Sequence, residues 1–272
     1  MDEQDVKIEH NICLRCSRCA NVCPRRHLIL VDEQITTVDD PLRSCIHCGH
    51  CMAVCSTMSL IVDGYDPDDF VDLPDVRVNY DDFLTLLKTR RSKRHFTARS
   101  ISDELWEKII GAAVTAPVSV PPSNVEITIL NGKSKVKAVL PSIVEELRKS
   151  MSDGKSDISP LVAGALQAWD EGEDYISYHS TGMMLFHADR GSDSYRENCT
   201  IAMTIAVLAA ESLRLGCCII GMISPALNRS TTAKNQLNIP ETNDVIGAII
   251  LGHPILRYRR EIPRQFKSVS YV

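Results

Sequence analysis

The sequence predicts two domains, a small cysteine-rich domain at the start of the chain and a larger domain of mixed helices and strands after it. Eight of the eleven cysteines lie within residues 13–55. The composition then changes abruptly at residues 63–75, where six aspartates and two prolines make the chain too polar to bury. We therefore expect a first domain at residues 1–65, an acidic linker at 66–79 and a second domain at 80–272, which is long enough to form its own core.

The cysteines of the first domain form two copies of the pattern C-x2-C-x2-C-x3-C. The copies are Cys13, Cys16, Cys19, Cys23 and Cys45, Cys48, Cys51, Cys55. Three thiolates at this spacing converge on one iron–sulfur cube, and the fourth cysteine of each copy ligates the cube of the other copy. The pattern predicts two [4Fe-4S] clusters, one held by Cys13, Cys16, Cys19 and Cys55 and the other by Cys45, Cys48, Cys51 and Cys23.

Cysteines can also serve in a structural zinc site or in a disulfide framework. A structural zinc site needs only four thiolates and gives no reason for a third cysteine at the same spacing. A disulfide framework needs an oxidising compartment. The N-terminus carries acidic residues where a signal peptide would be basic, so we expect a reducing, cytoplasmic location. The stretch resembles a bacterial-type two-cluster ferredoxin, with Ser56 in place of the usual proline and His47 where glycine is common.

The remaining features of the first domain and the bulk charge limit the possible partners. Residues 27–38 suit a hairpin between the two cysteine loops, and residues 58–62 suit an edge strand. The formal net charge of -5 argues against a nucleic-acid partner. The longest apolar run, residues 201–210, is half the length that a membrane span requires.

The second domain begins with a predicted helix over residues 81–89 that leads into a cluster of cations, Arg90-Arg91-Ser92-Lys93-Arg94. Cations at a helix C-terminus are often simply solvated, because the helix dipole favours them there. Alternatively, arginine forks and a serine hydroxyl suit an anion such as phosphate. Ser102 is a plausible N-cap for a following helix, and a strand over 125–130 and a helix to about residue 149 come next.

This order of features resembles the nitroreductase family of flavoproteins. Residues 90–96 read Arg-Arg-Ser-x-Arg-x-Phe, and an amphipathic helix, Ala116-Pro117 and a strand follow them, which is similar to the N-terminal part of the family's domain. The similarity continues in the loop from Gly216 to Gly221 and in the basic cluster after Leu256, and it covers about residues 80–265. The resemblance implies an α+β fold with a central, mostly antiparallel sheet and flanking helices, and a homodimer with FMN at the subunit interface.

The resemblance also assigns FMN-binding roles residue by residue. The resemblance implies that the FMN phosphate and ribityl chain are bound by Arg90, Arg91, Ser92 and Arg94, and that Pro117 and Ser119 lie along the flavin. It also implies that the backbone at Gly216 and Gly221 approaches the pyrimidine edge and N5 of the flavin. Two of the C-terminal residues Arg257, Arg259 and Arg260 would close on the phosphate. Residues 121–125 depart from the family, because they lack its flavin-binding asparagine motif, and Arg214 replaces a family glycine.

Other reactive side chains have simpler explanations. We expect Cys199, Cys217 and Cys218 to be small buried apolar residues rather than redox thiols. His179 and His187 are either proton donors near a substrate or ordinary surface and core residues. Met183, Met184 and Phe186 line a substrate pocket or form a helix core.

Together these features predict an FMN-dependent oxidoreductase. Electrons from a low-potential donor, ferredoxin or NAD(P)H, would pass through two [4Fe-4S] clusters to FMN and on to a small nitro-aromatic or quinone-like acceptor. No catalytic side chain is required, and oxygen-sensitive clusters suggest an anaerobic setting. The alternatives are an electron-transfer partner with a protein acceptor and a cluster-based redox sensor. No glycine-rich dinucleotide fingerprint is present, so NAD(P)H would have to bind without a Rossmann-type domain.

Overall fold

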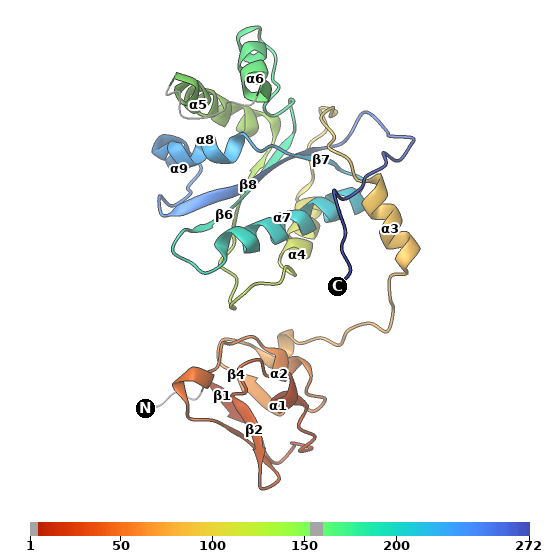
Figure 1. Ribbon diagram of the computed structural model, residues 1–272, viewed down its shortest axis with the longest axis vertical. Helices are drawn as coiled ribbons and strands as arrows, with labels where there is room; N and C mark the ends of the chain where they lie inside the picture. The colour runs from red at the N-terminus through yellow and green to blue at the C-terminus, as the bar shows by residue number, and fades with distance from the viewer. Residues whose placement is uncertain (1–4, 153–159) are drawn as a thin grey trace. The chain divides into compact units, whose positions relative to one another are not determined.

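A computed structural model of the chain describes residues 5–152 and 160–272, and it divides into two compact units. The first unit comprises the chain up to Arg77 together with Val118–Ser123. The second comprises Val78–Pro117 and Asn124–Val272. Each unit has its own buried core. Figure 1 shows the helices and strands of both units.

The first unit consists of two short antiparallel pairs and two short helices. Its elements are β1 (Val6–Ile8), α1 (Arg18–Val22), β2 (Leu28–Val31), β3 (Gln34–Thr37), η1 (Pro41–Arg43), α2 (His50–Ala53), β4 (Leu60–Val62) and η2 (Pro67–Asp69). Strands β2 and β3 form the predicted hairpin, and β4 pairs with β1, which confirms the expected edge strand. The core of this unit includes Leu28, Ile35, Met52 and Leu60.

The two cysteine runs have the same local backbone. The second run follows the first by 32 residues, as from Cys13 to Cys45. Arg15 and His47 hold matching positions, and both have a positive φ, 56° and 51°. This left-handed conformation accounts for the glycine that is common at the position of His47, because glycine adopts it without steric cost.

The second unit is built around one four-stranded antiparallel sheet with strand order β5-β6-β8-β7. Its strands are β5 (Glu126–Asn131), β6 (Gly182–Asp189), β7 (Gly216–Ile219) and β8 (Asn243–Gly252). Strand β8 lies between β6 and β7, and β6 is completely buried as far as Ala188. The mixed helix and strand content and the antiparallel sheet confirm the predicted α+β fold.

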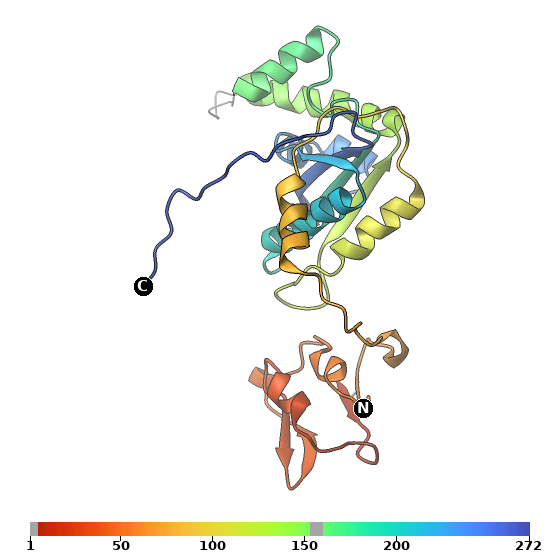
Figure 2. The ribbon, with the colours of Figure 1, turned by 90° about the vertical axis from the view of Figure 1, so that its right-hand side faces the viewer.

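Helices cover both faces of this sheet (Figures 1 and 2). They are α3 (Tyr80–Thr89), α4 (Asp103–Ala113), α5 (Lys133–Ser152), α6 (Pro160–Asp170), α7 (Tyr195–Ser212), α8 (Ile223–Arg229) and α9 (Thr231–Gln236). One core lies between the sheet and α4 with α7, and the other lies between the sheet and α5 with α6, α8 and α9. The small residues Ala202, Ala206 and Ala210 let α7 pack closely on the sheet.

The structure corrects one interpretation of the middle of this domain. Met183, Met184 and Phe186 do not belong to a helix; they lie in β6, where each is fully buried. A strand covered on both faces is apolar at consecutive positions, so its periodicity does not distinguish it from a buried helix. Cys199, Cys217 and Cys218 are buried, as expected.

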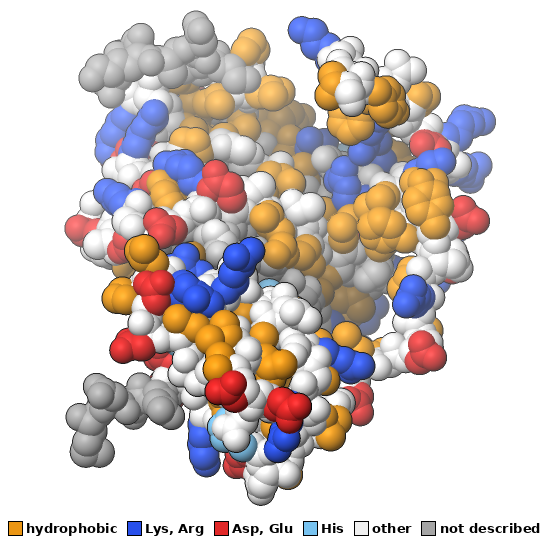
Figure 3. Space-filling model, turned by 60° about the horizontal axis from the view of Figure 1, so that its bottom comes forward, with side chains coloured by type: hydrophobic (Ala, Val, Ile, Leu, Met, Phe, Trp, Pro, Cys, Tyr) orange, Lys and Arg blue, Asp and Glu red, His pale blue; other side chains and the backbone are white. Residues whose placement is uncertain are grey.

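After β8 the chain continues as an extended, exposed segment to its C-terminus (Figure 2). Large apolar side chains stay on its surface, including Ile255, Tyr258, Phe266 and Tyr271. On the face drawn in Figure 3, apolar side chains in orange lie between charged groups. Among the described residues, no helix is both long and apolar enough to cross a membrane.

Candidate functional site

Two cavities of the first unit are each lined by four of the predicted cluster cysteines. The first cavity is lined by Cys13, Cys16, Cys19 and Cys55, among others. The second cavity is lined by Cys23, Cys45, Cys48 and Cys51, among others. These are the two sets that the doubled spacing predicts, with the fourth cysteine of each run crossing to the other cavity.

The thiols stand around these cavities rather than around single points. Within residues 5–152 and 160–272, no three His, Cys, Asp or Glu side chains are grouped so that they could hold one metal ion. A zinc site would need four ligands within about 2.3 Å of one ion. The space between the thiols therefore suits the chemistry of a cluster better than that of a mononuclear ion.

Hydrogen bonds from the chain point at several of the sulfurs. The backbone N–H of His27 donates to Cys23 Sγ at 3.3 Å, that of His47 to Cys45 Sγ at 3.4 Å and that of Ser59 to Cys55 Sγ at 3.4 Å. Such donors stabilise sulfur in its charged, ligating form.

The thiols differ in how readily they ionise. Burial raises the pKa of Cys51 to about 12 and also raises the pKa of Cys19 and Cys45. Burial acts the same way on Cys55, but hydrogen bonds from Ser59 and Thr57 outweigh it and lower its pKa to about 7. The surroundings of Cys55 therefore favour its ionised, ligating form.

In the second unit, three segments that are far apart in the sequence meet at one place. The backbone N–H of Lys93 donates to Cys217 O at 2.9 Å, so the basic segment after α3 lies beside β7. The backbone N–H of Ile255 donates to His95 O at 3.0 Å, and the guanidinium of Arg91 lies 5.8 Å from the ring centroid of Tyr258. The predicted basic motif, glycine loop and C-terminal cluster are thus neighbours.

One cation of this segment has an internal partner. Lys93 Nζ lies 2.9 and 2.8 Å from the two carboxylate oxygens of Glu211 on α7, and both side chains are about nine-tenths buried. This ion pair anchors the basic segment on α7. Sequence reasoning missed it, because Glu211 lies 118 residues away and carries no local signal.

Among the residues that the structure describes, the other arginines of this region lack an acidic partner. In the described part of the chain, no carboxylate forms an ion pair with any of Arg90, Arg91, Arg94, Arg257, Arg259 and Arg260. Arg91 Nε is buried, and no partner for it is present among the described residues. Unpaired arginines around a buried, unused donor form a candidate anion site, which favours the functional interpretation of this cluster.

Gly216 and Gly221, at the two ends of the β7 loop, have different surroundings, and these explain glycine at each position in a different way. A Cβ on Gly216 would lie 3.1 Å from the Cβ atoms of both Lys93 and Pro254, so packing of the chain itself favours glycine there. A Cβ on Gly221 would meet no described atom within 4 Å, so that backbone is open to a ligand. Arg214 has a φ of 61°, which explains why relatives place glycine at this position.

An open cavity of about 340 Å³ lies next to the basic segment. Its lining residues are Lys133, Lys137, Leu140, Trp169, Gly172, Glu173, Asp174, Ser177, His179 and Ser180. The guanidinium of Arg94 lies 5.6 Å from the ring centroid of Tyr178, which follows the lining residue Ser177 directly. The hydroxyl of Ser180 is buried, and no partner for it is present among the described residues.

Asp174 organises the loop that forms one wall of this cavity. Its carboxylate accepts the backbone N–H groups of Ile176, Ser177 and His179 at 3.1, 2.7 and 3.0 Å. Burial alone raises the pKa of Asp174, but these bonds and the Ser177 hydroxyl outweigh it and lower the pKa. They also hold Tyr178 and His179 at positive φ, 52° and 53°. Nothing in the sequence around Asp174 marks it for this role.

The two predicted histidines have different surroundings. His179 is half exposed at the cavity wall, with Nδ1 3.7 Å from Asp174 Oδ2. His187 is buried in β6. Its Nε2 contacts Thr128 Oγ1 at 3.0 Å, and its Nδ1 contacts Asn243 Nδ2 at 2.9 Å. His187 is therefore a satisfied core residue.

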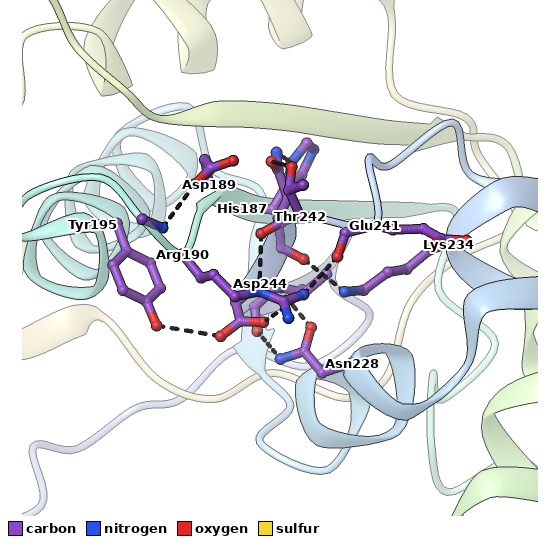
Figure 4. A network of polar contacts seen from close by, with 12 residues as sticks. His187, Asp189, Arg190, Tyr195, Asn228, Lys234, Glu241, Thr242 and Asp244 are labelled. Carbon is purple, nitrogen blue, oxygen red and sulfur yellow. Dashed lines mark hydrogen bonds and ion pairs between the residues drawn. The ribbon is translucent and has the colours of Figure 1, made fainter.

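His187 belongs to a polar network at one end of β6 and β8 (Figure 4). Lys234 Nζ donates to Asn243 O at 2.6 Å, and Arg190 Nε donates to Thr242 O at 3.0 Å. Asp244 accepts hydrogen bonds from Tyr195 Oη and Arg196. Because these residues contact one another, the network has a structural role at this end of β6 and β8.

Pro117 and Ser119 lie in the loop between α4 and β5, where both are exposed. Their expected place beside the flavin stays a prediction.

Comparison with known proteins decides the family. The nitroreductase family matches residues 87–253, and a 4Fe-4S dicluster domain matches residues 5–56. The chain belongs to the nitroreductase family. It carries a dicluster domain ahead of the nitroreductase domain, which confirms the predicted fusion.

Solved structures show the same fold. A nitroreductase with bound FMN from Bacteroides fragilis is 21% identical with a TM-score of 0.59, and the match covers 72% of this chain and 100% of that chain. A nitroreductase with bound FMN from Desulfitobacterium hafniense is 20% identical with a TM-score of 0.57, again over 72% and 100%. An FMN-dependent nitroreductase from Clostridium difficile is 20% identical with a TM-score of 0.55, over 71% and 100%. A search of curated proteins found no match.

Proposed function

We propose that this nitroreductase-family protein takes electrons from a low-potential donor through two [4Fe-4S] clusters to FMN, and from FMN to a nitro-aromatic or quinone-like acceptor. The observation that carries the proposal is the pairing, in one chain, of two four-thiol cavities with an unpaired arginine site. Clusters exchange single electrons, whereas FMN converts single electrons into the two-electron reduction of an organic group.

The two clusters would be held by the two sets of thiols that line the cavities. Cys13, Cys16, Cys19 and Cys55 would hold one, and Cys45, Cys48, Cys51 and Cys23 the other. The fit rests on the four-thiol lining of each cavity and on the N–H donors aimed at the sulfurs.

FMN would be bound at the arginine site and in the adjoining cavity. Arg90, Arg91, Ser92 and Arg94, with two of Arg257, Arg259 and Arg260, would hold the phosphate and ribityl chain. The unused Arg91 Nε and the absence of acidic partners in the described ranges 5–152 and 160–272 support an anion there. Gly221 offers open backbone near the ring, and Pro117, Ser119 and Gly216 complete the proposed set.

The chain's own part in the reaction is positioning. Asp174 fixes the loop at the cavity wall, and Ser180 presents an unused hydroxyl there. The ion pair of Lys93 with Glu211 keeps the basic segment in place. FMN, when bound, supplies the hydride equivalent, so no side-chain nucleophile is needed.

A homodimer with FMN at the interface is part of the proposal. The extended C-terminal segment exposes Ile255, Tyr258, Phe266 and Tyr271, among others, which is more apolar surface than a solvated tail needs. Tyr258 also lies against Arg91, so this segment starts at the proposed phosphate site. Ferredoxin or NAD(P)H is the proposed donor, in an anaerobic cytoplasm, without nucleic acid or membrane as a partner.

FMN titration of the cluster-loaded protein tests the arginine site. We expect Arg91→Ala to weaken FMN binding about 10- to 100-fold, because a hydrogen bond to a charged group contributes about 1.5–3 kcal/mol. Arg229→Ala, which removes an exposed arginine at the end of α8, is the matched control and should bind FMN normally. Equal affinities for the two variants would contradict the proposed phosphate site.

Anaerobic stopped-flow absorbance tests the electron path. With reduced ferredoxin or NAD(P)H as donor and a nitroarene as acceptor, cluster bleaching should precede flavin bleaching, and flavin reoxidation should match nitro reduction. If only a protein acceptor reoxidises the flavin, the protein is an electron-transfer partner; if no FMN binds, a cluster-based sensor replaces the reductase.

A further inference from the structure

The internal repeat of the first unit permits a comparison between its two crossing cysteines. Cys23 and Cys55 hold matching positions at the ends of their runs. Each accepts the backbone N–H of the residue four positions later, which is His27 for Cys23 at 3.3 Å and Ser59 for Cys55 at 3.4 Å. The backbone therefore donates one equivalent hydrogen bond to each of the two sulfurs.

The side chains around the two sulfurs differ. Ser59 Oγ lies 3.3 Å and Thr57 Oγ1 lies 3.6 Å from Cys55 Sγ. The counterparts in the first run are His27 and Arg25. A cysteine bound to iron carries no S–H, so both hydroxyls must then act as donors to Cys55 Sγ.

Charged side chains lie near both cavities. Arg15 and Arg18 lie within the first run, where the second run has His47 and His50. Arg18 lines the first cavity and Arg25 lines the second, so each cavity has a lining arginine, which is charged at any ordinary pH. One difference has the opposite sense to the extra hydroxyls, because Cys45 in the second cavity accepts the N–H of His47.

Donors and positive charges near a cluster stabilise its reduced form, which carries one more negative charge. The lining arginines of the two cavities offset each other, and two extra hydroxyl donors exceed one extra backbone donor. The first cavity should therefore favour the reduced cluster more strongly than the second.

We propose that the hydroxyls of Ser59 and Thr57 make the cluster of Cys13, Cys16, Cys19 and Cys55 the higher-potential one, so that an electron entering this unit settles there. The proposal rests on the two-cluster assignment under Proposed function. Under this proposal, Ser59 and Thr57 are positioning residues that act through Cys55, and electrons within this unit move toward the cluster that Cys55 ligates.

A reductive titration of the full-length, reconstituted protein, followed by the electron paramagnetic resonance of the reduced clusters, tests this. The double variant Ser59→Ala, Thr57→Val should move the higher of the two reduction steps to lower potential. We expect a shift of about tenfold in the equilibrium constant, or about 59 mV for one electron. The lower step should not move.

Two control variants separate hydroxyl donation from a general effect on the unit. Thr36→Val also removes a threonine hydroxyl, but this hydroxyl lies on β3 and contacts Thr37 O at 3.4 Å. It should leave both steps unchanged. Ser59→Thr keeps a hydroxyl at the critical position, and it should retain most of the original potential.

Iron analysis distinguishes the possible failures. If the double variant keeps about eight irons per chain and neither step moves, the hydroxyls do not tune the cluster and the inference is overturned. If the lower step moves instead, the ranking of the two clusters is wrong. If the unmodified protein never binds two clusters, the cofactor assignment falls, and this inference falls with it.

Discussion

Replacing Glu211 by glutamine should destabilise the second unit by about 3 kcal/mol. Glu211 holds Lys93 Nζ at 2.8 and 2.9 Å, and the exposed fractions of the two side chains are 9% and 12%. At 2.8 Å and an effective dielectric constant of about 20, the Coulomb attraction is about 6 kcal/mol, which offsets the cost of desolvating both charges. Removing one partner of a buried pair typically costs about 3–5 kcal/mol. The lower end applies because the glutamine oxygen still accepts one hydrogen bond.

Tryptophan fluorescence during denaturant unfolding measures this loss selectively. The chain has two tryptophans, Trp106 and Trp169, and both lie in the second unit. For a unit of this size, about 3 kcal/mol corresponds to a fall in Tm of about 6–12 °C. Glu104→Gln is the matched control, because it breaks the exposed pair of Glu104 with Lys108 and should cost less than about 0.5 kcal/mol.

The outcome separates a buried anchor from a surface ion pair. If Glu211→Gln costs no more than Glu104→Gln, the pair is solvated and does not fix the basic segment. If stability falls as expected, FMN affinity should fall as well, because Lys93 joins the segment of Arg91 to β7. Loss of stability with unchanged FMN affinity would refute the positioning role.

Three further predictions concern the second unit. Burial lowers the pKa of His187 from its ordinary 6.5, so the folded state holds this residue neutral and the free energy of unfolding should decline as pH falls below about 6.5. In unfolding measured at several pH values, His187→Gln should flatten this decline. His95→Gln, at an exposed histidine, should not flatten it. Gly182→Ala should cost about 1–3 kcal/mol in denaturant unfolding, because its Cβ would lie 2.6 Å from the Trp106 ring. Gly164 is an exposed position of α6, where an added Cβ would have no described atom within 4 Å, so Gly164→Ala should instead stabilise by up to about 1 kcal/mol. An equal cost at both glycines would contradict the crowding argument.

The cysteine spacing was the most informative part of the sequence. It predicted which thiols line each cavity, because a C-x2-C-x2-C turn dictates its own backbone, including the left-handed residues Arg15 and His47. The basic motif of Arg91 was predictable for a similar reason, since its cations are adjacent in the sequence. Local chemistry of this kind is visible in a single chain.

Features that depend on distant contacts were not predictable. The partner of Lys93 is on α7, and nothing near Glu211 in the sequence marks it as that partner. Strand β6 was taken for a possible helix, because burial on both faces removes the alternation that identifies a strand. Asp174 acts through backbone N–H groups, which carry no side-chain signature at all.

The crossing of Cys23 and Cys55 also determines when the cluster sites come into existence during synthesis. The second cavity lacks a thiol until Cys51 has been made, and the first lacks one until Cys55. A ribosome thus completes both sites within five residues, although the first cysteine was made more than thirty residues earlier. Under the proposed cluster assignment, neither half of the repeat would supply a complete set of ligands by itself, so iron loading would involve the whole unit and follow its translation.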